Sequence, residues 1–181
     1  MKLLSTQLRH IMPAARQGDI AKYLPHLNEW MPKYGITTTE RVRHFLAQVA
    51  HESGSLRYVE EIASGAAYDT GRLARILGNT PEADGDGQKN KGHGLIQITG
   101  GNNLREITKD WGIDIFSDPD ILKQPEYAVR SACWFWWKAG LNKKVDNGAT
   151  VRQVTRRVNG GINGLKEREA FYKRAMEAIR G

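Results

Sequence analysis

The sequence has only one cysteine among 181 residues, Cys133, so no disulfide can form within the chain. This excludes the disulfide-stapled scaffolds of small secreted proteins. Cys133 lies in the apolar run "SACWFWW", which predicts a buried thiol. No stretch approaches the ~18 apolar residues that a membrane-spanning helix needs. The opening "MKLLSTQLRHIM" lacks the unbroken apolar core of a signal peptide, and we expect synthesis in the cytosol.

Acids are fewer than bases, 20 against 27, which gives a net charge of +7. A basic surface favours polyanions such as nucleic acids, anionic lipids and bacterial cell-wall polymers. The densest basic stretches are "LNKK" at 141–144 and "RRVNGGINGLKERE" at 156–169, and neither belongs to a nucleic-acid-binding module. They form either a dedicated binding patch or an ordinary solvated surface. The length suits one domain, or one domain built as two lobes around a cleft.

Hydrophobic periodicity predicts a mainly α protein. "TTTE", Thr37 to Glu40, has the pattern of a capping box, and Pro125 suits the first residue of a helix. A glycine-rich loop is expected over 78–94, and "LIQIT" at 95–99 is expected to be a strand or an extended segment. No internal repeat or linker occurs. The expected helices cover residues 4–15, 19–34, 37–52, 68–77, 102–111, 125–140, 150–158 and 165–179.

The third expected helix has a carboxyl group on its apolar stripe. Val42, Phe45 and Val49 mark this stripe, and Glu52 lies seven residues after Phe45, only ~20° away around the helix. Burial on an apolar face disfavours the charged form of a carboxyl, and a general acid must be protonated. The alternative is an exposed acid at a fraying helix end, because "SG" follows directly.

Glu61, nine residues after Glu52, is a candidate for a second catalytic carboxyl. Glycosidases commonly use two carboxyls in different environments, one to protonate the leaving oxygen and one to activate water or attack. The helix break at Gly54 would let a loop carry Glu61 across a cleft. Glu60 is a competing candidate, and a solvated acidic pair without a catalytic role is the other interpretation.

Motifs for metal and nucleophile chemistry are incomplete. "HESGS" at 51–55 has a serine where the zinc-peptidase motif needs its second histidine, and His44 lies two helical turns from His51. "DGDGQKN" at 84–90 resembles a calcium-binding loop for three residues, then has Lys89 in place of the required glycine. No G-x-S-x-G motif occurs. We therefore expect neither a metal nor a cofactor.

Three segments together resemble the signature segments of the family 19 glycoside hydrolases. They are "AQVAHESGSLRYVEE" at 47–61, "GNTPEADGDGQKNKGHGLIQITGGNNL" at 78–104 and "VTRRVNGGINGLKER" at 154–168. Their order and spacing are most similar to those of the single-domain phage endolysins, over residues 40–175. The resemblance implies one mainly α, lysozyme-like domain over 1–181, with two lobes, a central cleft, at most a small β element, and no separate cell-wall-binding domain.

The resemblance also implies roles for individual residues. Glu52 matches the general acid, Glu61 the second acid, and Thr99 the hydroxyl residue that helps to hold the attacking water. Four further residues match positions that line the sugar cleft or lie near the acids: Gln97, Asn103, Asn159 and the basic Arg168. His93, Leu104 and Ile62 depart from the Arg, Tyr and Asn that are common in the family, which leaves the substrate contacts around the cleft open.

The function implied is hydrolysis of the β-1,4 glycan backbone of bacterial peptidoglycan with inversion. Such endolysins wait in the host cytoplasm until a holin opens the inner membrane, and then act in the periplasm. We expect peptidoglycan strands as the partner, a monomer, no nucleic acid and no stable membrane insertion. The alternatives are a chitinase acting on N-acetylglucosamine polymers and a non-catalytic glycan-binding relative. The single cysteine argues against a plant-type chitinase, and the intact Glu52, Glu61 and Thr99 argue against a pure binder.

Overall fold

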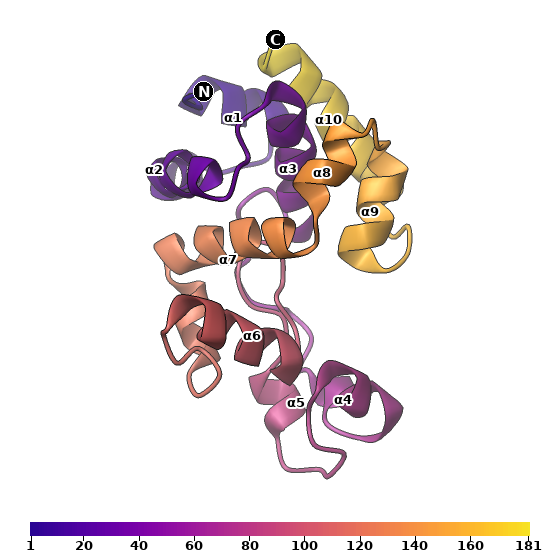
Figure 1. Cartoon of the computed structure of the whole chain (residues 1–181). Helices are drawn as coiled ribbons and strands as arrows, with labels where there is room; N and C mark the ends of the chain where they lie inside the picture. The colour runs from indigo at the N-terminus through magenta and orange to yellow at the C-terminus, as the bar shows by residue number, and fades with distance from the viewer. The chain divides into compact units, whose positions relative to one another are not determined.

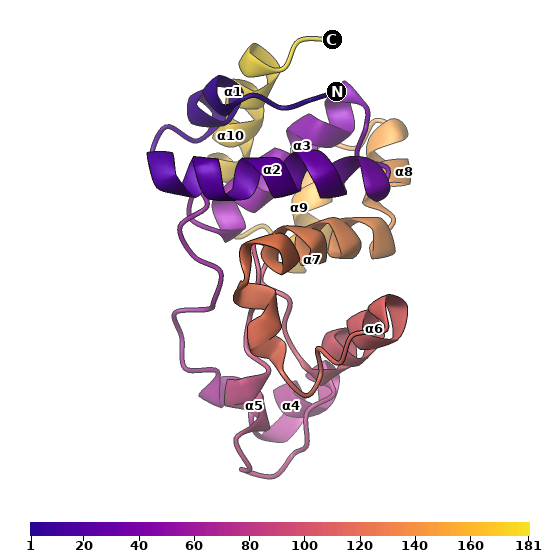
Figure 2. The same cartoon turned by 90° about the vertical axis from the view of Figure 1, so that its left-hand side faces the viewer.

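The computed structural model describes all residues, 1–181, and its regular secondary structure consists of helices and isolated β-bridges (Figure 1, Figure 2). The predicted mainly α class is confirmed. The chain divides into two compact units: unit 1 comprises Met1–Arg57 and Cys133–Gly181, and unit 2 comprises Tyr58–Ala132. Both ends of the chain therefore build unit 1, and unit 2 is a single inserted segment. None of the helices combines the length and apolar character of a candidate membrane span.

Unit 1 is organised around α3, which packs against α8, α9 and α10. Its core includes an edge-to-face contact between Phe45 and Trp136, with ring centroids 5.5 Å apart. Cys133 is buried as predicted, and burial raises the pKa of its thiol. The helices of unit 1 are α1 (Ser5–Ile11), α2 (Gln17–Lys33), α3 (Thr39–Glu52), α8 (Leu141–Asp146), α9 (Val151–Asn159), α10 (Leu165–Ala178) and the second part of α7 (Pro125–Lys138).

Unit 2 is a smaller unit of short helices and turns. Its buried apolar residues come largely from the turn 94–98, from α6, from the segment before α7 and from the first part of α7. The elements are the 3₁₀ helix η1 (Ala66–Tyr68), α4 (Gly71–Leu77), α5 (Asp86–Lys89), α6 (Gly101–Trp111), the 3₁₀ helix η2 (Pro119–Lys123) and the first part of α7. The loop predicted over 78–94 therefore contains one short helix, α5.

Several predicted helix boundaries were wrong. α1 ends at Ile11 instead of residue 15, because Met12 precedes Pro13 and a residue before proline disfavours the helical conformation. The N-cap of α3 is Thr38, whose hydroxyl accepts a hydrogen bond from the Arg41 amide, so the predicted capping box at Thr37 is out of register by one residue. The expected helix 68–77 is split between η1 and α4, and α8 and η2 were not predicted.

The segment "LIQIT" is not a strand. His93 and Ile98 form a two-way backbone pair, with N···O distances of 3.0 and 2.8 Å, and the residues between them make a tight turn. A second isolated bridge joins His93 to Glu60. Leu95, Ile96 and Ile98 of this turn are all buried. The small β element is thus limited to isolated bridges, and these bring residues 60, 93 and 98 together.

Candidate active site

Glu52 is the last residue of α3 in unit 1, and it pairs with Arg168 of α10. The Arg168 guanidinium donates from Nη2 to Glu52 Oε1 at 2.6 Å. The Arg168 side chain is fully buried, whereas that of Glu52 is 17% exposed. A buried arginine is stable only when its donors are satisfied, so this pairing fixes the direction of the carboxyl.

Arg168 makes two further hydrogen bonds. Nη1 donates to Gln48 Oε1 at 2.6 Å, and Nε donates to the Asn163 carbonyl at 3.1 Å. The Gln48 amide in turn donates to the Thr155 hydroxyl at 3.2 Å. Gln48, Thr155 and Arg168 are all fully buried. A continuous polar chain therefore runs through the core of unit 1 and connects α3, α9 and α10.

The predicted environment of Glu52 was wrong in one respect. Its helix face is not purely apolar, because Gln48 lies one turn before Glu52 and both side chains meet Arg168. Sequence reasoning missed Gln48 and Thr155. The available signal was a glutamine inside the otherwise apolar run "FLAQVA", four residues before the candidate acid and so on the same helix face.

A close approach at the start of α10 positions Arg168. Gly164 precedes the helix with φ +70°, and a Cβ there would lie 2.1 Å from the His51 ring. Only glycine tolerates both conditions. His51 also pairs with Glu167, Nδ1 to Oε1, at 3.0 Å. Asn159, predicted to line the cleft, is the exposed last residue of α9 in the same unit.

Glu61 belongs to unit 2 and accepts a hydrogen bond at each carboxylate oxygen. The Tyr68 hydroxyl donates to Oε1 at 2.8 Å, and the Gly92 amide donates to Oε2 at 3.0 Å. The Glu61 amide donates back to the Gly92 carbonyl at 2.8 Å. Partial burial and the bond to Glu61 raise the pKa of Tyr68 to about 12, so Tyr68 remains a donor throughout the neutral range.

Three other predicted residues of unit 2 are connected to one another. The Thr99 hydroxyl donates to the Gln97 carbonyl at 3.0 Å, and the Asn103 amide donates to the Thr99 carbonyl at 2.9 Å. Gln97 has φ +61°, an uncommon conformation for a residue with a side chain. A Cβ at Gly92 would lie 2.7 Å from Gln97 Oε1, so Gly92 touches both Glu61 and Gln97. Glu61 and Tyr68 form one part of a local cluster, and Gln97, Thr99 and Asn103 form the other. Gly92 lies between the two parts.

Comparison with known proteins identifies the family. The chain is 33% identical over 173 residues to a Haemophilus influenzae protein described as a glycosyl hydrolase family 19 domain-containing protein, covering 80% of this chain and 82% of that protein. The chain belongs to glycosyl hydrolase family 19. This family 19 chain is also 35% identical over 134 residues to the Arabidopsis thaliana endochitinase At2g43620, where it spans 73% of its own length but only 44% of the plant protein.

Solved structures share the fold of this family 19 protein. The TM-score is 0.79 with a bacterial family 19 chitinase, at 19% identity and with 99% and 96% of the two chains covered. It is 0.77 with chitinase C of Streptomyces griseus, at 18% identity and with 97% and 91% covered. A scan against models of protein families finds no match. The protein is thus a chitinase-like glycoside hydrolase of family 19, with the mainly helical fold of that family.

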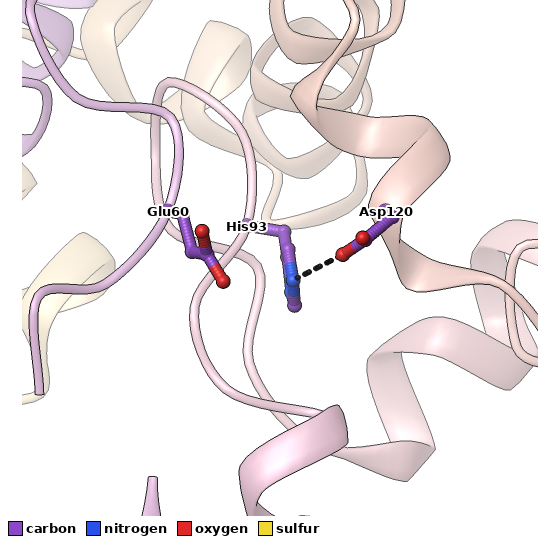
Figure 3. A group of neighbouring side chains, drawn as sticks. All are labelled: Glu60, His93 and Asp120. Atoms are coloured by element: carbon purple, nitrogen blue, oxygen red, sulfur yellow. Dashed lines mark ion pairs between the residues drawn. The ribbon is translucent and has the colours of Figure 1, made fainter. Parts of the chain in front are cut away.

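Three side chains of the types that bind metal ions lie together next to Glu61. Figure 3 shows His93 between Glu60 and Asp120, and one ligand atom of each lies within 4.8 Å of the others. Two lysines compete for the carboxylates: Lys91 lies 3.1 Å from Glu60, and Lys123 lies 2.9 Å from Asp120 and 3.6 Å from Glu60. The lysines balance the charge of both acids, so the group is an ion-pair network that fastens residue 60 to η2 and to residues 91–93.

The two adjacent glutamates, Glu60 and Glu61, have different electrostatic surroundings. The hydrogen bond from Lys91 lowers the pKa of Glu60, whereas Glu61 contacts a tyrosine hydroxyl and a backbone amide. Burial lowers the pKa of His93, so its imidazole stays neutral near pH 7. Glu60 is therefore a structural anion neutralised by cations, and it holds in place the segment that carries Glu61.

A second group joins Asp69, Asp84 and Asp86. Asp69 Oδ1 accepts hydrogen bonds from the Gly85 and Gly87 amides at 2.9 and 3.0 Å. The amide of Thr80 donates to Asp86 and its hydroxyl to Asp84, each at 2.7 Å. The stretch "DGDGQKN" thus closes the glycine-rich loop onto η1 through hydrogen bonds.

Proposed function

We propose that this family 19 protein is an endolysin that hydrolyses β-1,4 glycosidic bonds of bacterial peptidoglycan, with Glu52 as the general acid. The observation that carries the assignment is the bond from the buried Arg168 to Glu52 Oε1, which fixes the direction of the carboxyl and leaves Oε2 to carry the proton. Proton transfer to a leaving oxygen requires a donor held in a fixed direction. A carboxyl that is anchored by one oxygen and partly exposed meets this requirement, because the other oxygen is left to face substrate.

Glu61 is the proposed second carboxyl, acting as a base on the attacking water. The bonds from Tyr68 and Gly92 hold its carboxylate, and they favour Glu61 over Glu60, whose charge is taken up by lysines. Thr99 would hold the water, since its hydroxyl is oriented by the Gln97 carbonyl. We expect this arrangement to invert the anomeric centre. Four residues would contact the sugar chain or organise the acid: Gln97, Asn103, Asn159 and Arg168.

The net charge of +7 supports peptidoglycan over chitin as the substrate, because peptidoglycan carries carboxylates and chitin is neutral. We also propose that the protein acts on the cell wall as a monomer, after a holin opens the inner membrane. The chitinase alternative is supported by relatives that are described as endochitinases. The two functions share the acid chemistry and differ in the polymer that binds.

The test compares two insoluble substrates, purified peptidoglycan and chitin. We expect soluble fragments from peptidoglycan, and mass spectrometry of their reducing ends would identify the sugar whose bond is cut. Glu52→Gln should abolish release while leaving the circular dichroism spectrum unchanged, because proton donation contributes ~10²–10⁴-fold. Release from chitin alone would replace the endolysin proposal with the chitinase. A Glu52→Gln variant with more than a tenth of wild-type activity would refute the acid assignment.

A further inference from the structure

Most of the net charge lies in one segment of unit 1. Residues 138–160 contain six basic residues and a single acid, a net +5 of the chain's +7. The acid, Asp146, forms an ion pair with Arg41 of α3. Its charge is therefore already engaged by Arg41, and the rest of the segment's charge comes from its six basic residues. They are Lys138, Lys143, Lys144, Arg152, Arg156 and Arg157.

The two densest basic stretches of the sequence meet at one pocket. α8 and α9 pack against each other, and a pocket of about 320 Å³ lies where α7 gives way to α8. Its lining contains three basic residues, one amide, no acid and no aromatic ring. The lining residues are Ala139, Gly140, Lys143, Lys144, Asn147 and Arg157. We call the three basic members, Lys143, Lys144 and Arg157, the basic pocket.

The fold holds these cations together for local reasons. Leu141 and Val145 are buried, which fixes the rotation of α8 and leaves Lys143 and Lys144 exposed between them. Arg157 Nε donates to the Ala139 carbonyl at 3.1 Å, which holds the guanidinium at the pocket wall. Its two terminal nitrogens remain for another acceptor. Three cations around one pocket repel one another unless an anion is bound.

We propose that the basic pocket binds the carboxylates of peptidoglycan and holds the enzyme on the anionic wall during hydrolysis. This inference rests on the proposed function and names a second contact for the same polymer. Arg157 and the lysines provide charge-assisted hydrogen bonds to carboxylates, and the Asn147 amide adds a neutral donor and acceptor. A pocket without aromatic rings offers no stacking platform for the bases of a single-stranded nucleic acid. Neutral chitin offers the pocket no anion.

The test uses Glu52→Gln as the background, so that binding is measured without hydrolysis. The pocket variant adds Lys143→Gln, Lys144→Gln and Arg157→Gln. The control variant adds the same charge change at three exposed residues of unit 1 outside the pocket, Lys2→Gln, Lys173→Gln and Arg180→Gln. Dissociation constants for purified peptidoglycan, for chitin and for duplex DNA would be measured by co-sedimentation or competition, at 0.05 M and 0.5 M NaCl.

We expect the pocket variant to bind peptidoglycan roughly tenfold more weakly at low salt, since it loses three exposed charge contacts. The control variant should stay within about twofold of the background, and high salt should narrow the difference because the Debye length shrinks. Chitin binding should be unaffected. Equal weakening in both variants would mean that only net charge matters and would overturn the pocket. Unchanged binding of the pocket variant to peptidoglycan, or an equal loss of its affinity for DNA, would also overturn the pocket.

The proposed function and the pocket can fail separately. Hydrolysis by the active enzyme tests the function, and binding by the Glu52→Gln protein tests the pocket. The pocket variant with Glu52 intact should cleave a soluble, carboxylate-free N-acetylglucosamine oligomer at the wild-type rate and lose activity only on the intact wall. Peptidoglycan binding through the pocket without any hydrolysis would leave the pocket standing and refute the function. Hydrolysis of peptidoglycan together with unchanged binding by the pocket variant would support the function and refute the pocket.

Discussion

Arg168→Met removes a buried guanidinium while keeping most of the apolar stem. Three acceptors lose a donor: the Glu52 carboxylate, the Gln48 side-chain oxygen and the Asn163 carbonyl. Gln48 is fully buried, so its unsatisfied oxygen costs ~1–3 kcal/mol. Glu52 is 17% exposed, so water partly replaces its lost partner, and the cost stays below the ~3–5 kcal/mol of a fully buried pair. We expect a total loss of ~2–4 kcal/mol in the free energy of unfolding.

Thermal and urea unfolding, followed by circular dichroism, would measure this loss. For a chain of this length, ~1 kcal/mol corresponds to ~2–4 °C, so the melting temperature should fall by ~5–15 °C. Lys173→Met is the matched control, because Lys173 is exposed on the same helix and its replacement should cost less than ~0.5 kcal/mol. A fall below about 2 °C for Arg168→Met would contradict the view that the polar chain organises the core of unit 1.

The remaining predictions concern the chemistry and the pH dependence. The first reducing end formed from a β-linkage should be the α-anomer by NMR, and a β-anomer or an anhydro end would reject inversion. Glu61→Gln should lose base catalysis, and Thr99→Ala should reduce activity less than Glu61→Gln does. Tyr68→Phe removes one of the two bonds to Glu61, so kcat should fall ~10-fold while KM and stability change little; an unchanged kcat would exclude this positioning role. Burial lowers the pKa of His44 below its ordinary 6.5. The unfolded chain therefore takes up the proton first, and stability should be complete above pH 6.5 and fall as the pH drops below it. Urea midpoints should show a shallower fall for His44→Phe, and an identical slope would exclude His44 as a source.

Local sequence was sufficient for elements whose signals lie within a few residues. Pro125 begins α7 as predicted, and α6 and α10 were placed to within a residue or so, because their apolar periodicity and glycine boundaries agree. α8 was missed because six residues carry too little periodicity. "LIQIT" was misassigned because a short β-branched run also fits a buried turn.

Family motifs were sufficient to nominate Glu52, Glu61 and Arg168, since their spacing along the chain is characteristic. Spacing could not provide their partners. Gln48 and Thr155 meet Arg168 only because α3, α9 and α10 pack together, and Tyr68 reaches Glu61 only because η1 folds back beside it. Such contacts depend on packing between segments that are distant in sequence.

The sequence by itself determined the mainly α class, the family, the candidate acids and the excess of positive charge, because each depends on residue identity and short-range spacing. Only the tertiary structure decided that Glu52 is held by a buried arginine, that Glu60 and Glu61 have different partners, and that "LNKK" and Arg157 line one pocket. Electrostatic interactions fall off with distance in space, so the effect of a charge is set by packing and not by its position in the chain.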